Sequence, residues 1–206
     1  MNVIIAIDPG ASGGVAVAAF GKVVCQAMPA TQGDVMELIR DVYRTAEVED
    51  VETVCVLEEV NGFVGKAQPG SAMFKFGEGY GFIKGVVQTL GIKLVLVRPQ
   101  VWQKSFGLGT ASRCASKSEW KNKLKAEAQR RFPELLVTLA TADALLILEW
   151  MRNLQPRSAS RTGNETDKHG FFHPQKGAEG AKDFRRDAEK DSRDGCATNN
   201  IEQTKQ

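Results

Sequence analysis

Three carboxylates stand out because each lies in apolar sequence. Asp8 ends an apolar run over residues 3–7, and Glu58 ends a second run over residues 54–57. Asp143 lies inside an apolar stretch with a helical composition. Burying a carboxylate costs several kcal/mol unless a cation or hydrogen bonds compensate. Clustered carboxylates repel unless divalent cations lie between them, so the three acids predict a site for Mg²⁺ or Mn²⁺ if the fold brings them together.

Each acid also has a plainer interpretation. Asp8 precedes Pro9 and Gly10 and could simply form a turn. Glu58 or its neighbour Glu59 could be a surface acid at a strand end, and Asp143 could be a helix acid satisfied by a nearby lysine or arginine. The three together favour the metal site over three unrelated roles.

The composition changes abruptly near Asn153. Residues 1–153 carry the apolar patterns of one folded domain, whereas residues 154–206 form a polar tail without apolar periodicity, which predicts disorder. Both histidines, His169 and His173, fall in the tail. The folded part therefore has no Ser-His-Asp or Cys-His mechanism and no histidine-ligated zinc.

The four cysteines form no C-x-x-C pair, which suits a reducing compartment. The sequence shows no signal peptide and no apolar run of membrane-spanning length, so we expect no membrane role. The expected location is the cytoplasm of a bacterial or phage-infected cell, or an organelle matrix.

A basic segment follows the acidic half of the chain. Residues 104–132 contain eight basic side chains against two acidic ones, while residues 1–97 are net acidic. A basic segment beside an acidic metal site suits a polyanionic substrate that is cut with the help of metals. A solvated helix face is the alternative.

Apolar periodicity predicts strands at residues 3–7, 14–20, 22–28, 54–58 and 94–97. It predicts helices around residues 35–43 and at 71–90, 100–104, 118–131 and 140–152. This order implies an α/β fold with a mixed sheet and helices on its faces. Gly77, Gly81 and Gly85 form a stripe on one face of the long helix, and such a stripe suggests that another backbone packs there, from the same chain or from a partner subunit.

Three motifs in this order resemble the RuvC-like Holliday junction resolvases of the RNase H-like superfamily. They are Ile-Asp8-Pro-Gly, Leu-Glu58-Glu59-Val and Ala-Asp143-Ala-Leu-Leu. The stretches at residues 74–81 and 99–103 look more like the phage and plastid branch. The resemblance covers about residues 1–152 and implies an RNase H-like five-stranded mixed sheet.

The resemblance also implies an activity and its site residues. The expected protein is a homodimer that makes paired symmetric nicks in a four-way DNA junction with two Mg²⁺ ions per active site, for which Mn²⁺ would substitute. Asp8 would contact both ions, Glu58 one and Asp143 the other, with Glu59 second to Glu58. The family usually adds an acid or histidine before the last acid, and residues 135–142 contain neither, which leaves Glu59 or Glu134 as substitutes or a weakly held second ion.

The expected DNA contacts come from the basic segment and one aromatic residue. Phe63, in a glycine-bounded loop, is the candidate for insertion at unstacked bases. The phosphate-binding candidates are Lys117, Lys121, Lys123, Lys125 and Arg130. Three other functions stay open: an RNase H-type nuclease acting on RNA–DNA hybrids, a non-catalytic branched-DNA binding protein, and an actin-like ATPase.

Overall fold

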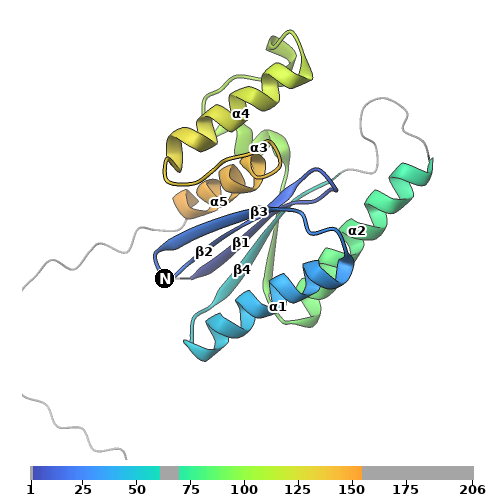
Figure 1. The fold of residues 1–206 in the computed structure, drawn as a ribbon, viewed down its shortest axis with the longest axis vertical. Helices are drawn as coiled ribbons and strands as arrows, with labels where there is room; N and C mark the ends of the chain where they lie inside the picture. Colours follow the sequence, from blue (N-terminus) through green and yellow to red (C-terminus); the bar gives the residue numbers. More distant parts are fainter. Residues whose placement is uncertain (1, 61–69, 155–206) are drawn as a thin grey trace, which may run out of the picture. The chain divides into compact units, whose positions relative to one another are not determined.

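Five strands form one mixed sheet in the computed structural model, which describes residues 2–60 and 70–154. The strands are β1 (Val3–Asp8), β2 (Gly14–Ala19), β3 (Lys22–Ala27), β4 (Thr53–Glu58) and β5 (Lys93–Val97). Their order across the sheet is β3-β2-β1-β4-β5 (Figure 1). β1 pairs antiparallel with β2 and parallel with β4, so the predicted mixed sheet of five strands is confirmed.

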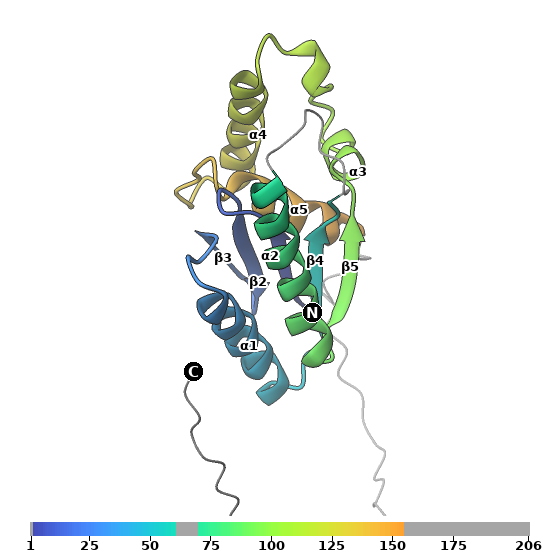
Figure 2. The same ribbon diagram turned by 90° about the vertical axis from the view of Figure 1, so that its right-hand side faces the viewer.

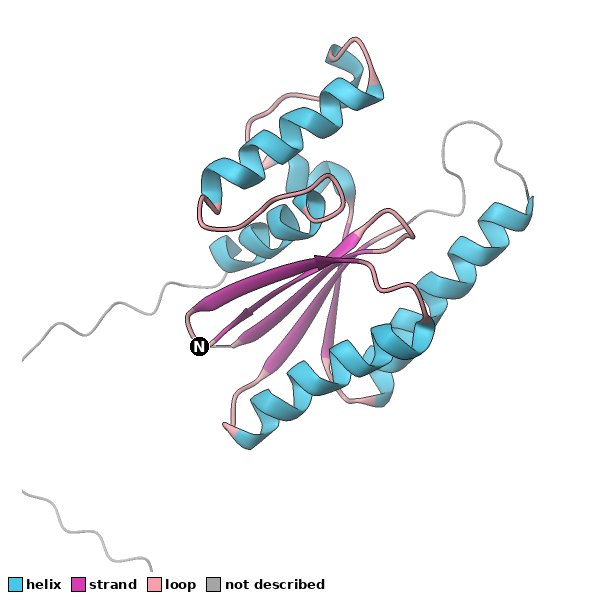
Figure 3. Ribbon diagram, in the orientation of Figure 1, coloured by secondary structure: helices cyan, strands magenta, loops and turns pink. Residues whose placement is uncertain are grey.

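Helices cover both faces of the sheet. The helices are α1 (Gln32–Val48), α2 (Gly70–Thr89), α3 (Pro99–Lys104), α4 (Lys117–Arg131) and α5 (Ala142–Leu154). α1 and α2 lie on one face, whereas α5 lies on the other with α4 outside it (Figure 1). In Figure 2, α1 and α2 lie in front of the sheet and α5 lies behind it. Figure 3 shows the resulting three layers of helix, sheet and helix. This arrangement buries the central strands on both sides, as parallel pairing requires.

The alternation of side chains along β1 separates two hydrophobic cores. Ile4 and Ala6 contribute to the core beneath α5, whereas Val3, Ile5 and Ile7 contribute to the core beneath α1 and α2. A fully buried isoleucine or leucine is worth about 1.5–3 kcal/mol relative to an exposed one. Both faces therefore hold the strand in one register, because a slip of one residue would exchange its two sets of side chains.

Two helices begin with side-chain caps. Thr31 Oγ1 accepts a hydrogen bond from the Asp34 amide at the start of α1 (3.1 Å), and Ser116 Oγ accepts one from the Glu119 amide at the start of α4 (3.1 Å). A cap of this kind satisfies one of the free amides of the first turn. The caps fix where α1 and α4 begin.

All predicted strands and helices are present, and α1 extends beyond the apolar residues that indicated it. No helix within the described ranges is both long and apolar enough to span a membrane. Phe63 and the polar tail lie outside the described residues, so the domain boundary near residue 153 stays a prediction.

Candidate active site

The register of two parallel strands brings Asp8 and Glu58 together. β1 and β4 pair through Ile7 and Leu57, and each acid is the next residue along its strand. Side chains alternate along a strand, and Ala6 and Val56 point toward α5. Asp8 and Glu58 therefore point toward α5 as well, from the same edge of the sheet.

Burial and mutual repulsion disfavour the charged forms of these two acids. Burial first, and the Asp143 carboxylate second, raise the pKa of Asp8 from 3.8 to about 7, although Lys121 lowers it. Burial first, and the Asp8 carboxylate second, raise the pKa of Glu58 from 4.5 to about 7. Such raised values are typical of carboxylates gathered at a functional site.

Asp143 joins them from the first turn of α5. The turn before this helix is held by two threonines: the Thr138 amide donates to Thr141 Oγ1 (3.0 Å), and the Thr141 amide donates to Thr138 Oγ1 (3.2 Å). α5 packs over β1 and β2, which brings its first turn to the end of β1. The Asp143 side chain is only 6% exposed.

Two glycines after Asp8 make room for this arrangement. A Cβ on Gly13 would lie 2.2 Å from the Asp8 carbonyl oxygen and 3.0 Å from its carboxyl carbon. A Cβ on Gly14 would lie 2.6 Å from the Ala140 carbonyl oxygen, in the segment that leads into α5. Any side chain at these positions would push the backbone away from Asp8 or α5 away from β2.

Trp102 holds Glu58 in place. Its indole Nε1–H donates to Glu58 Oε2 (2.9 Å), and its ring is completely buried in the core beneath α5. Donation to the charged form lowers the pKa of Glu58 and so opposes the effect of burial. α3 carries this tryptophan and begins with Pro99, whose fixed φ suits the first helical position.

Lys121 of α4 forms an ion pair with Asp143. Its ammonium donates to Asp143 Oδ2. Burial lowers the pKa of Lys121, but Asp143, Asp8 and Glu58 together raise it by more. The pKa of Lys121 therefore lies above its usual value. The plainer interpretation of Asp143, a helix acid paired with a nearby lysine, therefore describes the geometry in the absence of metal.

The donor set nevertheless fits a hard divalent cation. Across residues 2–60 and 70–154, no group of three His, Cys, Asp or Glu side chains is arranged so that it could hold a metal ion without movement. However, Asp143 Oδ1 is buried and has no hydrogen-bond partner among those residues. Asp8, Glu58 and Asp143 offer only oxygen ligands, which Mg²⁺ and Mn²⁺ prefer, and a cation among them would favour their charged forms.

The two alternative acids face elsewhere. Glu59 Oε2 accepts a hydrogen bond from Arg98 Nε (3.1 Å), and its carboxylate also raises the pKa of Tyr80, for which burial is the larger cause. Tyr80 belongs to α2, on the opposite face of the sheet from α5. Glu134 is exposed in the segment between α4 and α5. Glu58 therefore points toward the other acids, whereas Glu59 points away from them. The sequence favoured Glu58 over Glu59 but could not show in which direction either side chain points.

The predicted phosphate-binding residues divide into different environments. Lys121 lies inside the acidic cluster, whereas Lys117 and Lys123 are exposed and Lys125 is partly buried. Arg130 donates to Glu127 of the same helix (2.7 Å). Contacts of these residues with DNA stay a prediction.

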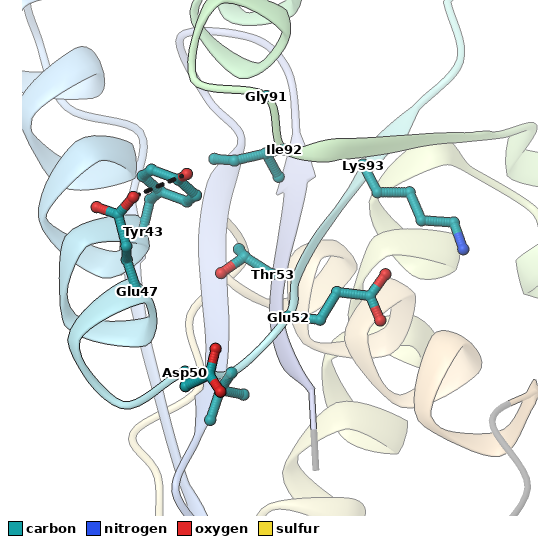
Figure 4. Close-up of a pocket in the computed structure, with 9 residues that line it drawn as sticks. Tyr43, Glu47, Asp50, Glu52, Thr53, Gly91, Ile92 and Lys93 are labelled. Atoms are coloured by element: carbon teal, nitrogen blue, oxygen red, sulfur yellow. Dashed lines mark hydrogen bonds between the residues drawn. The ribbon is translucent and has the colours of Figure 1, made fainter. Parts of the chain in front are cut away.

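Two hollows lie at opposite ends of the sheet. The first, about 760 Å³, opens beside the turn that follows Asp8 and is mostly apolar; Gly10, Met28, Phe76, Gly79 and Tyr80 line it. The second, about 500 Å³, lies at the other end, where β4 and β5 begin (Figure 4). Its lining includes three acids, Glu47, Asp50 and Glu52, and Glu47 accepts a hydrogen bond from Tyr43 (3.4 Å).

The sequence did not identify the roles of Trp102, Lys121, Gly13 and Gly14. The glycines had a visible signal, because two in succession after an acid-ended strand suggest close backbone approach. The roles of Trp102 and Lys121 had no comparable signal. Each depends on which way a helix side chain points, and periodicity alone does not fix this for a six-residue helix or for a helix as rich in lysine as α4.

Comparisons with known proteins give structural similarity only. No family model matches the chain, and no curated protein matches its sequence. Thermus thermophilus RuvC aligns with 15% identity over 73% of this chain and 95% of that one, with a TM-score of 0.45. T. thermophilus RuvC in complex with a Holliday junction substrate aligns with 12% identity over 74% and 96%, with a TM-score of 0.47. The yeast mitochondrial Holliday junction resolvase Ydc2 aligns with 12% identity over 73% and 78%, with a TM-score of 0.39.

Proposed function

We propose that this chain is a divalent-metal-dependent endonuclease that resolves four-way DNA junctions by paired symmetric nicks. The observation that carries the proposal is the convergence of Asp8, Glu58 and Asp143 from two strands and a helix. Three carboxylates buried this closely cost free energy unless cations neutralise them. A structural role would be met by apolar residues at lower cost, so the arrangement favours chemistry.

The chain's residues divide the work at this site. Asp8, Glu58 and Asp143 would hold Mg²⁺, as one ion or two, with Mn²⁺ as a substitute. When bound, the metal supplies charge neutralisation for hydrolysis of a phosphodiester by water. Trp102 keeps Glu58 in one orientation. The acids attract the metal, and Lys121 places a positive charge beside them through its ion pair with Asp143. The core beneath α5 supplies the rigid support that a site of this kind needs.

The choice of a four-way junction as substrate rests on the sequence motifs. The experiment that tests it incubates the protein and Mg²⁺ with a synthetic four-way junction, a linear duplex and an RNA–DNA hybrid. We expect paired nicks in the junction and little cutting of the duplex. Preferential cutting of the hybrid would instead assign an RNase H-type nuclease, and ATP hydrolysis without DNA would assign an ATPase.

A second candidate is a branched-DNA binding protein that does not cut. The ion pair between Lys121 and Asp143 favours it, because the lysine neutralises an acid that a metal would otherwise engage. Isothermal titration with Mg²⁺ and Mn²⁺ separates the candidates. A nuclease site should bind the ions, whereas a protein that only binds junctions should not.

We also propose a homodimer that uses one face of α2. Gly77, Gly81 and Gly85 have no described atom within 4 Å of an added Cβ, so the stripe does not pack on the described part of its own chain. Ile83 and Val87, which are buried, lie on the other side of the helix. A two-fold enzyme would match the symmetry of the junction.

The variant Gly81→Leu tests this dimer. It should give monomers in sedimentation and lose paired nicking while its metal binding is unchanged. A dimeric Gly81→Leu protein would place the interface elsewhere.

A further inference from the structure

The apolar hollow beside Asp8 is connected to both strands that carry the acids. Gly10 and Ala11, which line it, follow Asp8 by two and three residues. Tyr80, which also lines it, lies near Val60 and Glu59 at the end of β4. The hollow therefore opens at the same end of the sheet as the carboxylates but on the opposite face, so a nucleic-acid strand held at the carboxylates would meet it on crossing this end of the sheet.

The lining suits a flat apolar group attached to a negative chain. Phe76, Tyr80 and Phe82 supply aromatic rings, and Lys75 supplies a positive charge. The described residues that line the hollow include no carboxylate, in contrast to the acid-lined hollow at the opposite end of the sheet. The volume of about 760 Å³ lies within the usual range for small-ligand sites.

A glycine keeps this space open. Gly79 lies within α2, where glycine is less favourable than alanine. Its added Cβ would meet no described atom within 4 Å, although the position lines the hollow. Gly79 thus has no packing partner to explain it, and a larger side chain at this position would enter the hollow.

We infer that this hollow receives one unstacked nucleobase of the DNA strand held at the acids. The inference rests on the proposed function and adds the position of a base to it. At the open branch point of a four-way junction, the last base pair of each arm lacks a stacking neighbour on one side, so its bases are extruded at lower cost than bases within a duplex. Aromatic side chains bind the face of an extruded base regardless of sequence. Lys75 would lie near the phosphate of the same nucleotide. Within a linear duplex every base pair is stacked on both sides and costs more to open, so the hollow would favour branched DNA over duplex.

The first test uses the wild-type protein without divalent metal, so that binding is measured without cutting. Four-way junctions carrying a single abasic site are scanned across the nucleotides around the branch point. We expect one nucleotide position, repeated by symmetry, at which loss of the base weakens binding about fivefold to a hundredfold, the range carried by one stacked base. Equal binding at all positions would overturn the inference.

The second test introduces a larger side chain at Gly79, which lines the hollow. Gly79→Leu should weaken junction binding by a similar factor and leave duplex binding within about twofold, because only the base would be displaced. Gly79→Ala, which adds a single carbon, should weaken it less. Sedimentation and thermal unfolding confirm that each variant keeps the fold and subunit number of the wild type. Equal loss for junction and duplex, or no loss for either, would overturn the inference.

The wild-type arm distinguishes this inference from the proposed function. If the wild type binds and cuts junctions but Gly79→Leu and the abasic scan show no effect, only the base site is wrong. If the wild type neither binds nor cuts branched DNA, the proposed function fails and the base site fails with it.

Discussion

The two ends of the sheet carry acids in very different surroundings. Where β1 and β4 end, Asp143 is 6% exposed and burial raises the pKa values of Asp8 and Glu58 to about 7. Where β4 and β5 begin, Glu47, Asp50 and Glu52 lie exposed around a hollow (Figure 4). Exposed acids keep their hydration and need no compensation, whereas buried ones depend on partners. The comparison shows that burial, more than the number of acids, marks the candidate active site.

The largest expected effect is on catalysis at the buried end. Asp8→Asn keeps the shape of the side chain but removes a metal ligand, so cleavage of four-way junctions should fall on the order of a thousandfold while junction binding persists. The matched control is Asp50→Asn at the exposed end, where asparagine tolerates the positive φ of 52°. Wild-type cutting by Asp8→Asn, measured in a gel assay, would show that the centre lies elsewhere.

The next effect concerns the ion pair. Lys121→Met leaves the Asp143 carboxylate buried without its partner, and we expect a loss of about 1–3 kcal/mol in metal-free unfolding free energy. The value stays below that of a fully buried pair because the lysine side chain is 35% exposed. Mg²⁺ should stabilise this variant more than the wild type in thermal melts. Lys123→Met, on an exposed site of the same helix, should change neither quantity.

Stability should also depend on pH in the direction set by the raised pKa values. Asp8 and Glu58 titrate near 3.8 and 4.5 when unfolded and near 7 when folded, so the folded state binds more protons between these values. The contribution of these two carboxylates to the unfolding free energy of the metal-free protein should therefore be highest below about pH 4. It should fall by up to about 4 kcal/mol for each carboxylate as the pH rises through about 7, and level off above about pH 8.

Two additions sharpen the pH experiment. Saturating Mg²⁺ should flatten the dependence, because a bound cation favours the charged carboxylates. Asp8→Asn should flatten it too and should be more stable than the wild type at pH 8. A stability that rises between pH 4 and pH 7 by the same amount in both proteins would contradict the assigned burial.

The smallest effect concerns the hydrogen bond that positions Glu58. Trp102→Phe keeps an aromatic ring in the core but removes the indole donor, and cation affinity should weaken about tenfold, as for other residues that orient a metal ligand. Calorimetric titration with Mn²⁺ measures this change. An unchanged affinity together with a lowered melting temperature would assign Trp102 to packing alone.

The sequence was sufficient for the parts of the molecule that follow from apolar pattern. The strands and helices could be predicted, because apolar runs and apolar periodicity indicate buried elements. The three acids could be selected as candidates, because Asp8 and Glu58 each end an apolar strand and Asp143 lies inside an apolar helix. The sequence left open whether the fold brings the two strand ends and α5 together.

Side-chain direction and backbone clearance could not be predicted in the same way. Lys121 lies against Asp143, a contact that depends on the rotation of α4 and hence on how Trp120 and Leu124 pack in the core. Its contact with DNA phosphates stays a prediction. The glycine stripe on α2 was left between two interpretations, and the structure excludes packing against the described part of its own chain.

The parallel pairing of β1 with β4 has a consequence for how the site comes into existence. Val3 pairs with Thr53, and Asp143 follows Asp8 by well over a hundred residues, so the acids are neighbours in space but distant in the chain. A chain that emerges from the ribosome presents Asp8 almost at once and its last partner only with α5. Until then the face of β1 and β2 that α5 covers has no neighbour to bury it. Assembly of the site is therefore a late event in folding, governed by contacts of high sequence separation, which form slowly.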